Sequence, residues 1–173
     1  MPTLRHALKD YDGRNTDTLK WVAKQFSEQI DYGAELVEII KGDNDLLAEG
    51  ASWLLKNWLE GGSFIDQATT ACLLKKPETF ATWQTQLHIC QTLQYLSLEN
   101  AICDDTADWL KALTSHKRPF LRAWALDGLS TIALQHSRFL HAAEFALGKA
   151  QDDPSATVRA RARAVQRKLA KLP

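Results

Sequence analysis

The sequence lacks the features that mark membrane and secreted proteins. No apolar run approaches the roughly 18 residues that a membrane-spanning helix needs, so we expect no membrane partner. The first 15 residues contain no continuous apolar segment followed by a small-residue cleavage site, and we expect no secretory signal. The chain has three cysteines and none of them is in a CxxC pair, which favours reduced thiols in a cytoplasmic protein.

Motifs for catalysis and for cofactors are missing as well. The five histidines form no HExxH motif, none is paired with cysteines at zinc-binding spacing, and there is no GxxxxGK phosphate loop. Cys90 falls in an apolar helical column, and Cys103 precedes Asp104 and Asp105, whose charges disfavour a thiolate. We therefore predict no catalytic residue, no metal and no cofactor, and the pattern favours a non-catalytic protein.

Net charge is also absent, because 21 basic and 21 acidic side chains cancel. Their distribution is uneven. Residues 1–115 carry 10 basic and 17 acidic side chains, whereas residues 116–173 carry 11 basic and 4 acidic ones. Such a dipolar chain can steer a charged partner, and it permits head-to-tail self-association, but it does not decide the fold.

What the chain does contain is helical periodicity with a repeat near 37 residues. Four sets of mostly apolar and small residues have the spacing i, i+4, i+7 and i+11, and they begin at Leu46, Trp83, Leu121 and Val158. A second series has a strict 37-residue spacing, Leu36, Leu73, Leu110 and Leu147. A two-helix unit that repeats every 30 to 50 residues is typical of an α-solenoid. The alternative is an irregular helical bundle in which the leucine spacing is a coincidence.

Two segments resemble the first helix of a HEAT repeat. They are "KRPFLRAWALDGL" (117–129) and "DDPSATVRARARAVQRKL" (152–169), and both place a proline before the helix, then an arginine after an apolar residue, then small residues on the packing face. "DNDLLAEGASWLLKNWL" (43–59) lacks the arginine, and "TFATWQTQLHICQTL" (79–93) has Gln84 in its place. Over most of residues 31–171 the chain thus resembles the HEAT-repeat (armadillo-type) family.

The resemblance implies an all-α superhelix of about four to five helix pairs, with the second helices lining the concave side. We expect an atypical N-terminal cap region (1–42), three repeats (43–76, 77–115 and 116–151) and a C-terminal capping helix (152–173). In the first of these, a helix over residues 16–30 should turn Leu19, Ala23, Phe26 and Ile30 inward. A buried Asp–Arg pair that joins neighbouring repeats would support this register.

The common role of the family is a binding scaffold. Residues that point away from the leucine series form a candidate binding set on the concave face, Asp31, Glu38, Asp105, Asp108, Trp109 and Phe145. The carboxylates would prefer a basic or mixed-charge protein or peptide. Two interpretations stay open for each aromatic ring: an exposed anchor for the partner, or a packing contact between helices.

Some HEAT-like proteins are enzymes, notably alkylated-base DNA glycosylases and bilin lyases, and no glycosylase motif is present. A nucleic-acid function would use a basic patch on the last helix, Arg159, Arg163 and Arg167. Arg159 occupies the place that Arg122 has one repeat earlier, so it belongs to the repeat pattern. The remaining arginines are either a solvated cap or a phosphate-binding site. We predict a non-catalytic adaptor, with a nucleic-acid-binding solenoid as the alternative.

Overall fold

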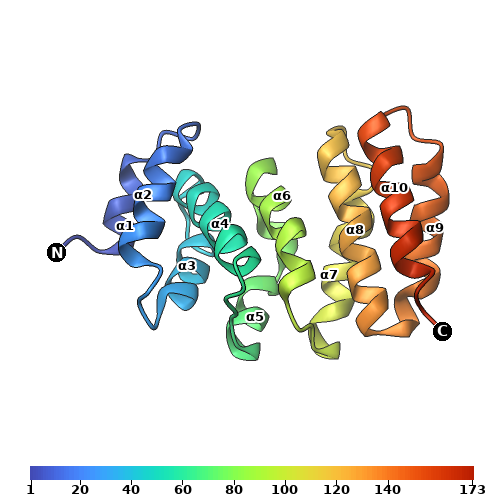
Figure 1. Ribbon diagram of the computed structural model, residues 1–173, viewed down its shortest axis with the longest axis horizontal. Coiled ribbons are helices and arrows are strands. Elements are labelled where there is room, and N and C mark those ends of the chain that lie inside the picture. Colours follow the sequence, from blue (N-terminus) through green and yellow to red (C-terminus); the bar gives the residue numbers. More distant parts are fainter. The chain divides into compact units, whose positions relative to one another are not determined.

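The computed structural model describes residues 1–173 and contains helices but no β-strand, which confirms the all-α prediction (Figure 1). The chain divides into two compact units. Unit 1 comprises Met1–Leu74 and Thr79–Ser97, and unit 2 comprises Lys75–Glu78 and Leu98–Pro173. None of the helices combines the length and the apolar character that crossing a membrane requires.

Unit 1 is built around its longest helix, α4. Its helices are α1 (Leu4–Ala7), α2 (Thr16–Phe26), α3 (Tyr32–Ile40), α4 (Asp45–Glu60), α5 (Gln67–Leu74) and α6 (Trp83–Thr92). Short 3₁₀ turns follow α1 (Leu8–Asp10) and α6 (Leu93–Tyr95), and a third (Pro77–Thr79) precedes α6, of which only Thr79 belongs to unit 1. Side-chain oxygens cap the first turns of α1, α2, α4 and α6, where backbone N–H groups lack helical partners. α4 packs against α2, α3 and α6.

Two residues of unit 1 that the sequence predicted to face the core are exposed instead. Ile30 is fully exposed, because α2 ends at Phe26 and the chain then turns through a Gln29 N–H to Phe26 carbonyl hydrogen bond of 3.0 Å. On α4, Leu46 is 41% exposed, and the residue after it, Leu47, is buried instead. Since α4 is covered by helices on several sides, its buried face is wider than a single i, i+4, i+7 stripe.

Gly33 of α3 lies very close to the side chains of Trp58 and Ile65. A Cβ atom at this position would lie 2.7 Å from the side chains of both Trp58 and Ile65. The neighbouring Tyr32 ring packs edge-on against Trp58, with ring centroids 5.3 Å apart. α3 can therefore lie against Trp58 only because residue 33 has no side chain.

Gly33→Ala should therefore lower the free energy of unfolding, by about 1–3 kcal/mol, because the added methyl group forces Trp58 or Ile65 to move. Gly148→Ala on α9 is the matched control: an added Cβ meets nothing within 4 Å there, and alanine should stabilise the helix by about 0.5–1 kcal/mol. Urea unfolding of both variants measures the difference. Equal stabilities for the two variants would contradict the close packing at Gly33.

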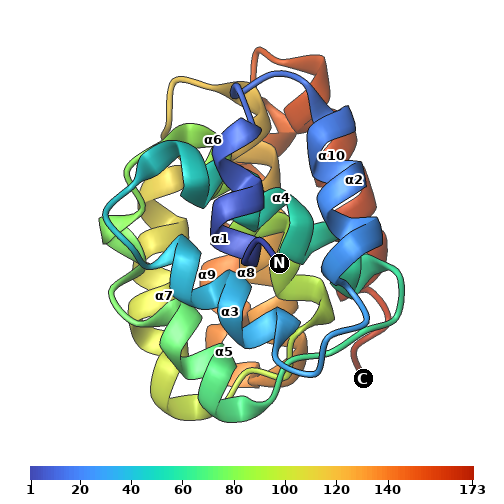
Figure 2. The ribbon, with the colours of Figure 1, turned by 90° about the vertical axis from the view of Figure 1, so that its left-hand side faces the viewer.

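Unit 2 contains α7 (Asn100–Leu113), α8 (Pro119–Gln135), α9 (Leu140–Gln151) and α10 (Ala156–Leu169), with a 3₁₀ turn (Ser137–Phe139) leading into α9. α8 is central and packs against α7, α9 and α10; α8 and α10 lie side by side (Figures 1 and 2). The predicted core columns hold here, because Leu121, Ala125 and Ile132 of α8 and Val158, Ala162 and Val165 of α10 are buried.

The 37-residue leucine series is buried in three of its four members. Leu36, Leu73 and Leu110 are fully buried, but Leu147 is only partly so. α9 instead buries a face of three small residues, Ala143, Ala146 and Ala150. This face meets α8 and α10, and Leu147 lies at its margin.

An ion pair connects the start of α8 to the loop before α10. Arg122 Nε and Nη2 each donate to a carboxylate oxygen of Asp153 over 2.9 Å, and the two side chains are only 17% and 12% exposed. The Arg122 hydrogen bonds hold the pKa of the Asp153 carboxyl below its usual value. This largely buried Asp–Arg pair joins the predicted repeat 116–151 to the predicted capping helix 152–173.

The arginines of α8 and α10 also make equivalent backbone contacts. Arg122 Nη1 donates to the His116 carbonyl over 2.9 Å, and Arg159 Nη1 donates to the Asp153 carbonyl over 2.7 Å. In both cases the acceptor lies six residues before the arginine. The predicted equivalence of Arg122 and Arg159 is therefore present in the geometry of unit 2.

A second arginine fastens the other end of α9. Arg138, just before α9, donates to the Asp104 carboxylate and to the Asn100 side chain, both on α7. This contact is more exposed than the first, with the Arg138 side chain 44% and the Asp104 side chain 67% accessible. α9 is thus attached at both ends by arginine contacts, with an alanine face in between.

Candidate functional site

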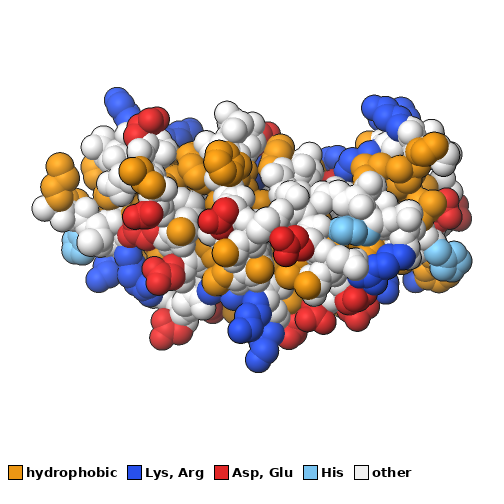
Figure 3. All heavy atoms as spheres, turned by 90° about the horizontal axis from the view of Figure 1, so that it is seen from below, with side chains coloured by type: hydrophobic (Ala, Val, Ile, Leu, Met, Phe, Trp, Pro, Cys, Tyr) orange, Lys and Arg blue, Asp and Glu red, His pale blue; other side chains and the backbone are white.

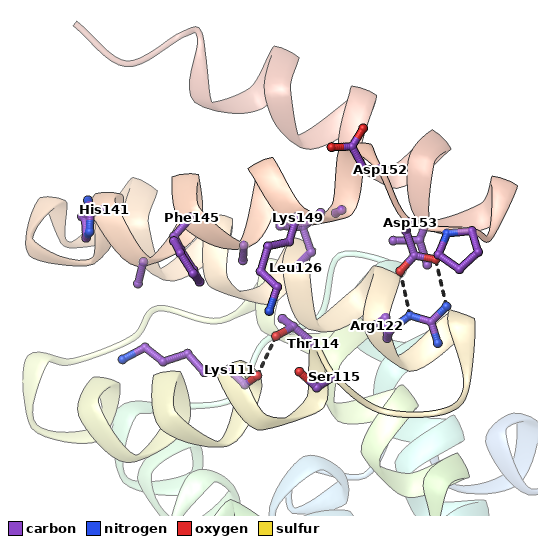
Figure 4. Close-up of a pocket in the computed structure, with 15 residues that line it drawn as sticks. Lys111, Thr114, Ser115, Arg122, Leu126, His141, Phe145, Lys149, Asp152 and Asp153 are labelled. Carbon is purple, nitrogen blue, oxygen red and sulfur yellow. Dashed lines mark hydrogen bonds and ion pairs between the residues drawn. The ribbon is translucent and has the colours of Figure 1, made fainter.

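Unit 2 has a cleft of about 560 Å³ between the end of α7 and one face of α9 (Figure 4). Its floor comes from α8 and from the start of α10, where Leu126 and Val158 contribute apolar surface. The cleft exists because α7 and α9 both pack on α8 without filling the space between them. We refer to it below as the α7–α9 cleft.

One wall of the cleft is a helical face of α9. Ala142, Phe145, Ala146 and Lys149 follow the spacing i, i+3, i+4, i+7, so they lie on one side of the helix. The two alanines leave space, and the Phe145 ring extends from α9 into it (Figure 4). Phe145 is 66% exposed although a ring of this size is usually buried.

The polar part of the cleft lies at the end of α7. In Figure 4 the Lys149 side chain reaches from α9 toward Thr114 and Ser115, whereas the Lys111 side chain extends along α7 away from them. The Thr114 hydroxyl donates to the Lys111 carbonyl over 2.6 Å, whereas the Ser115 hydroxyl makes no hydrogen bond within the protein. The Lys149 ammonium group lies 5.7 Å from the centroid of the Phe145 ring.

The charges around the cleft are not equivalent. Arg122 and Asp153 neutralise each other at one end. Lys111 is 3.2 Å from Asp108, but both side chains are largely exposed, so water screens this pair strongly. Lys149 has no ion pair at all. Apart from Asp152, an exposed carboxylate that also lines the cleft, the side chains that can offer charge to a ligand here are therefore the two lysines.

The structure does not gather the predicted carboxylates at this cleft. Glu38 is exposed on α3 of unit 1 and Asp31 just before that helix, where they flank a hollow together with Ala34 and Ala68. Asp105 and Asp108 are exposed on α7 of unit 2, and neither lines the cleft. The acidic groove was expected from the sequence because all four residues point away from the leucine series, but two of them belong to unit 1 and two to unit 2.

The two candidate aromatic anchors have different environments. Trp109 is only 6% exposed, because α7 buries a wide face that also includes Thr106, Leu110 and Leu113. An exposed Trp109 ring is thus the wrong interpretation, and the packing interpretation describes this residue. Phe145 is exposed and lines the cleft. On the face shown in Figure 3, exposed apolar side chains lie scattered among charged ones, so exposure alone would not select a site.

The sequence did not select Lys111, Lys149 or Ser115 as site residues. Lys149 could have been recognised from the sequence as a site residue, because it stands one helical turn after Phe145 on the same face. Lys111 and Ser115 could not, because they line the cleft only at the distance that separates α7 from α9.

The basic residues of α10 are used mostly in packing. Asp127, a buried residue of α8, accepts ion pairs from Arg161 at 3.5 Å and from Lys168 at 3.3 Å. Arg161 also stacks over the Trp124 ring at 3.9 Å. With Arg159 bound to the Asp153 carbonyl, Arg163 and Arg167 are the exposed members of the predicted basic patch.

A buried serine–histidine contact in unit 1 is structural. Ser52 Oγ lies 2.9 Å from His88 Nδ1 and 3.0 Å from the Glu49 carbonyl, and it joins α4 to α6. Ser52 is fully buried, so no substrate can reach its hydroxyl. Burial lowers the pKa of His88 to about 4, which keeps the ring neutral at pH 7.

Comparisons with known proteins gave no match, whether to protein-family models, to curated proteins or to solved structures. A functional assignment therefore depends on the chemistry of the residues around the α7–α9 cleft.

Proposed function

We propose that the chain is a HEAT-like α-solenoid that acts as a non-catalytic adaptor, and that it binds a segment of another protein in the α7–α9 cleft. The observation that carries this proposal is an open apolar cleft with an exposed phenylalanine on its wall. The repeat assignment is supported by the matching contacts of Arg122 and Arg159, and by the burial of Leu36, Leu73 and Leu110 at 37-residue spacing.

Burial of the Phe145 ring supplies the driving force. Moving a phenylalanine side chain out of water is worth about 1.5–3 kcal/mol, and an apolar partner residue seated over Leu126 and Val158 adds a comparable amount. Because the helices that form the walls are already packed on α8, the binding surface is largely organised before the partner arrives.

The alternative, a nucleic-acid-binding solenoid, has less support. Arg159, Arg161 and Lys168 already bind groups within unit 2, so few cations on α10 remain for phosphates. Only Arg163 and Arg167 of the predicted patch face solvent. Neutralising two phosphates gives weak, strongly salt-dependent binding.

The proposal predicts that Phe145→Ala abolishes selection of peptides from a degenerate nine-residue library. The wild-type chain should enrich peptides with an apolar central residue, and the variant should bind them at least about tenfold more weakly, because the ring's contact area is gone. Phe120→Ala is the matched control, since Phe120 is 57% exposed on α8 of the same unit but outside the cleft. Selection is read by sequencing the bound pool, and affinities by fluorescence anisotropy.

If the wild-type chain enriched no peptide, or if Phe145→Ala kept the wild-type selection and affinities, the α7–α9 cleft would not be the binding site. Loss of binding in Phe120→Ala alone would place the site on the α8–α10 face instead.

A further inference from the structure

We infer that the segment bound in the α7–α9 cleft is acidic, with a carboxylate next to the apolar side chain that contacts Phe145. This inference rests on the proposed function and adds the chemistry of the partner. It reverses the charge that the sequence suggested, because the predicted carboxylates lie elsewhere and the cleft itself is lined by lysines.

The first support is the position of the two lysines. Lys149 comes from α9 and Lys111 from α7, so they approach the cleft from its two opposite walls (Figure 4). Both are exposed, and neither is held in a buried ion pair that a ligand would have to break. A carboxylate placed between the walls gains attraction from both ammonium groups.

The second support is a free hydrogen-bond donor on α7, toward which Lys149 reaches (Figure 4). The Ser115 hydroxyl lines the cleft without a partner in the protein, whereas the Thr114 hydroxyl is used by the Lys111 carbonyl. A carboxylate oxygen can accept from Ser115 and from a lysine together, and such charge-assisted hydrogen bonds are about twice as strong as neutral ones.

The third support is the placement of polar groups relative to apolar ones. Lys149 stands one turn after Phe145, and its ammonium group is near the ring. A ligand residue that covers Phe145 therefore brings its neighbour to the lysine. This favours a peptide in which aliphatic or aromatic side chains alternate with aspartate or glutamate.

A nucleic-acid strand fits the same cleft less well. Asp152 lies among the lining residues and Asp108 is beside Lys111, and both repel a continuous phosphate chain. The floor at Leu126 and Val158 calls for an apolar side chain, which a sugar–phosphate backbone does not provide. A short carboxylate-bearing peptide can approach the lysines and leave the aspartates in water.

Three synthetic peptides test the inference against the full chain. Each has nine residues, blocked termini and a central Leu-Phe pair, flanked on both sides by Asp and Glu, by Asn and Gln, or by Lys. We expect the acidic peptide to bind at least about tenfold more tightly than the amide peptide, and the lysine peptide to bind more weakly than either. Fluorescence anisotropy at two salt concentrations gives the affinities.

Variants identify the groups responsible. Lys111→Ala and Lys149→Ala should each weaken the acidic peptide by about three- to tenfold while leaving the amide peptide unchanged. Lys149→Glu should reduce the preference for the acidic peptide further and improve binding of the lysine peptide. Lys24→Ala, which removes an exposed lysine from α2 in unit 1, is the matched control and should change nothing.

The outcomes separate this inference from the proposed function. If the amide or lysine peptide bound as tightly as the acidic one while Phe145→Ala still weakened it, the site would stand and the acidic preference would be wrong. If none of the three peptides bound, both would fail. If a labelled 20-nucleotide single strand bound and lost affinity in Lys111→Ala and Lys149→Ala, a nucleic-acid ligand would replace the peptide.

Discussion

Trp109→Ala is expected to lower the free energy of unfolding by about 3–5 kcal/mol, the range measured when large aromatic side chains are removed from protein cores. The Trp109 ring is 6% exposed and belongs to the buried face of α7. The substitution removes its apolar contacts and leaves a cavity that rigid neighbouring helices fill only in part. Urea unfolding followed by far-ultraviolet circular dichroism measures the loss.

Phe145→Ala is the matched comparison, because it also removes an aromatic ring that the sequence placed in the same candidate set. Phe145 is 66% exposed, so its loss should change the free energy of unfolding by no more than about 0.5 kcal/mol. The two variants thus separate a residue of the core from a residue of the cleft. Similar losses in both would mean that the different burial of the two rings has no energetic consequence.

Acidification is expected to destabilise unit 1 through His88. Its pKa is about 4 in the folded chain, chiefly because burial disfavours the charged ring, whereas an unfolded histidine titrates near 6.5. Above pH 6.5 the His88 ring is neutral in both the folded and the unfolded chain, so its titration does not change the free energy of unfolding. As the pH falls from 6.5 to 4, His88 is protonated in the unfolded chain but stays neutral in the folded chain. This difference lowers the free energy of unfolding by up to about 3 kcal/mol.

His88→Gln should remove this part of the acid sensitivity, since glutamine cannot titrate but can still hydrogen bond near Ser52. The free energy of unfolding, measured in urea at pH 7 and pH 4.5, should fall less in the variant than in the wild-type chain. His141→Gln, an exposed position on α9, is the control and should keep the wild-type pH dependence. Identical pH profiles for wild type and His88→Gln would show that protonation of His88 does not lower the free energy of unfolding, contrary to the prediction.

The helices could be predicted from the sequence, but the buried face of each was harder to assign. In unit 2 the columns at Leu121 and Val158 are buried, although α8 packs against three helices, α7, α9 and α10. In unit 1 the column at Leu46 is displaced by one residue, because Leu47 and not Leu46 lies on the buried face of α4. The spacing of apolar residues indicates the mean orientation of the buried face of a helix, but not how many neighbouring helices cover that face.

The site was less predictable than the fold. Phe145 and Trp109 have the same sequence signal, an aromatic residue near the side opposite the leucine series, and only their packing distinguishes them. The cleft itself depends on the gap between α7 and α9, a distance between segments some 40 residues apart. The charge of the cleft walls could not be predicted for the same reason: acidic residues are numerous before residue 115, but the walls of the cleft present Lys111 and Lys149.

The two ends of α9 are held by ion pairs that differ in their sensitivity to ionic strength. Its middle contributes only alanines to the core, and its ends are fastened by the Arg138–Asp104 and Arg122–Asp153 contacts. Dissolved ions screen the exposed Arg138 contact far more than the largely buried Arg122 pair. Added salt should therefore weaken the Arg138–Asp104 contact before α9 more than the Arg122–Asp153 contact after it.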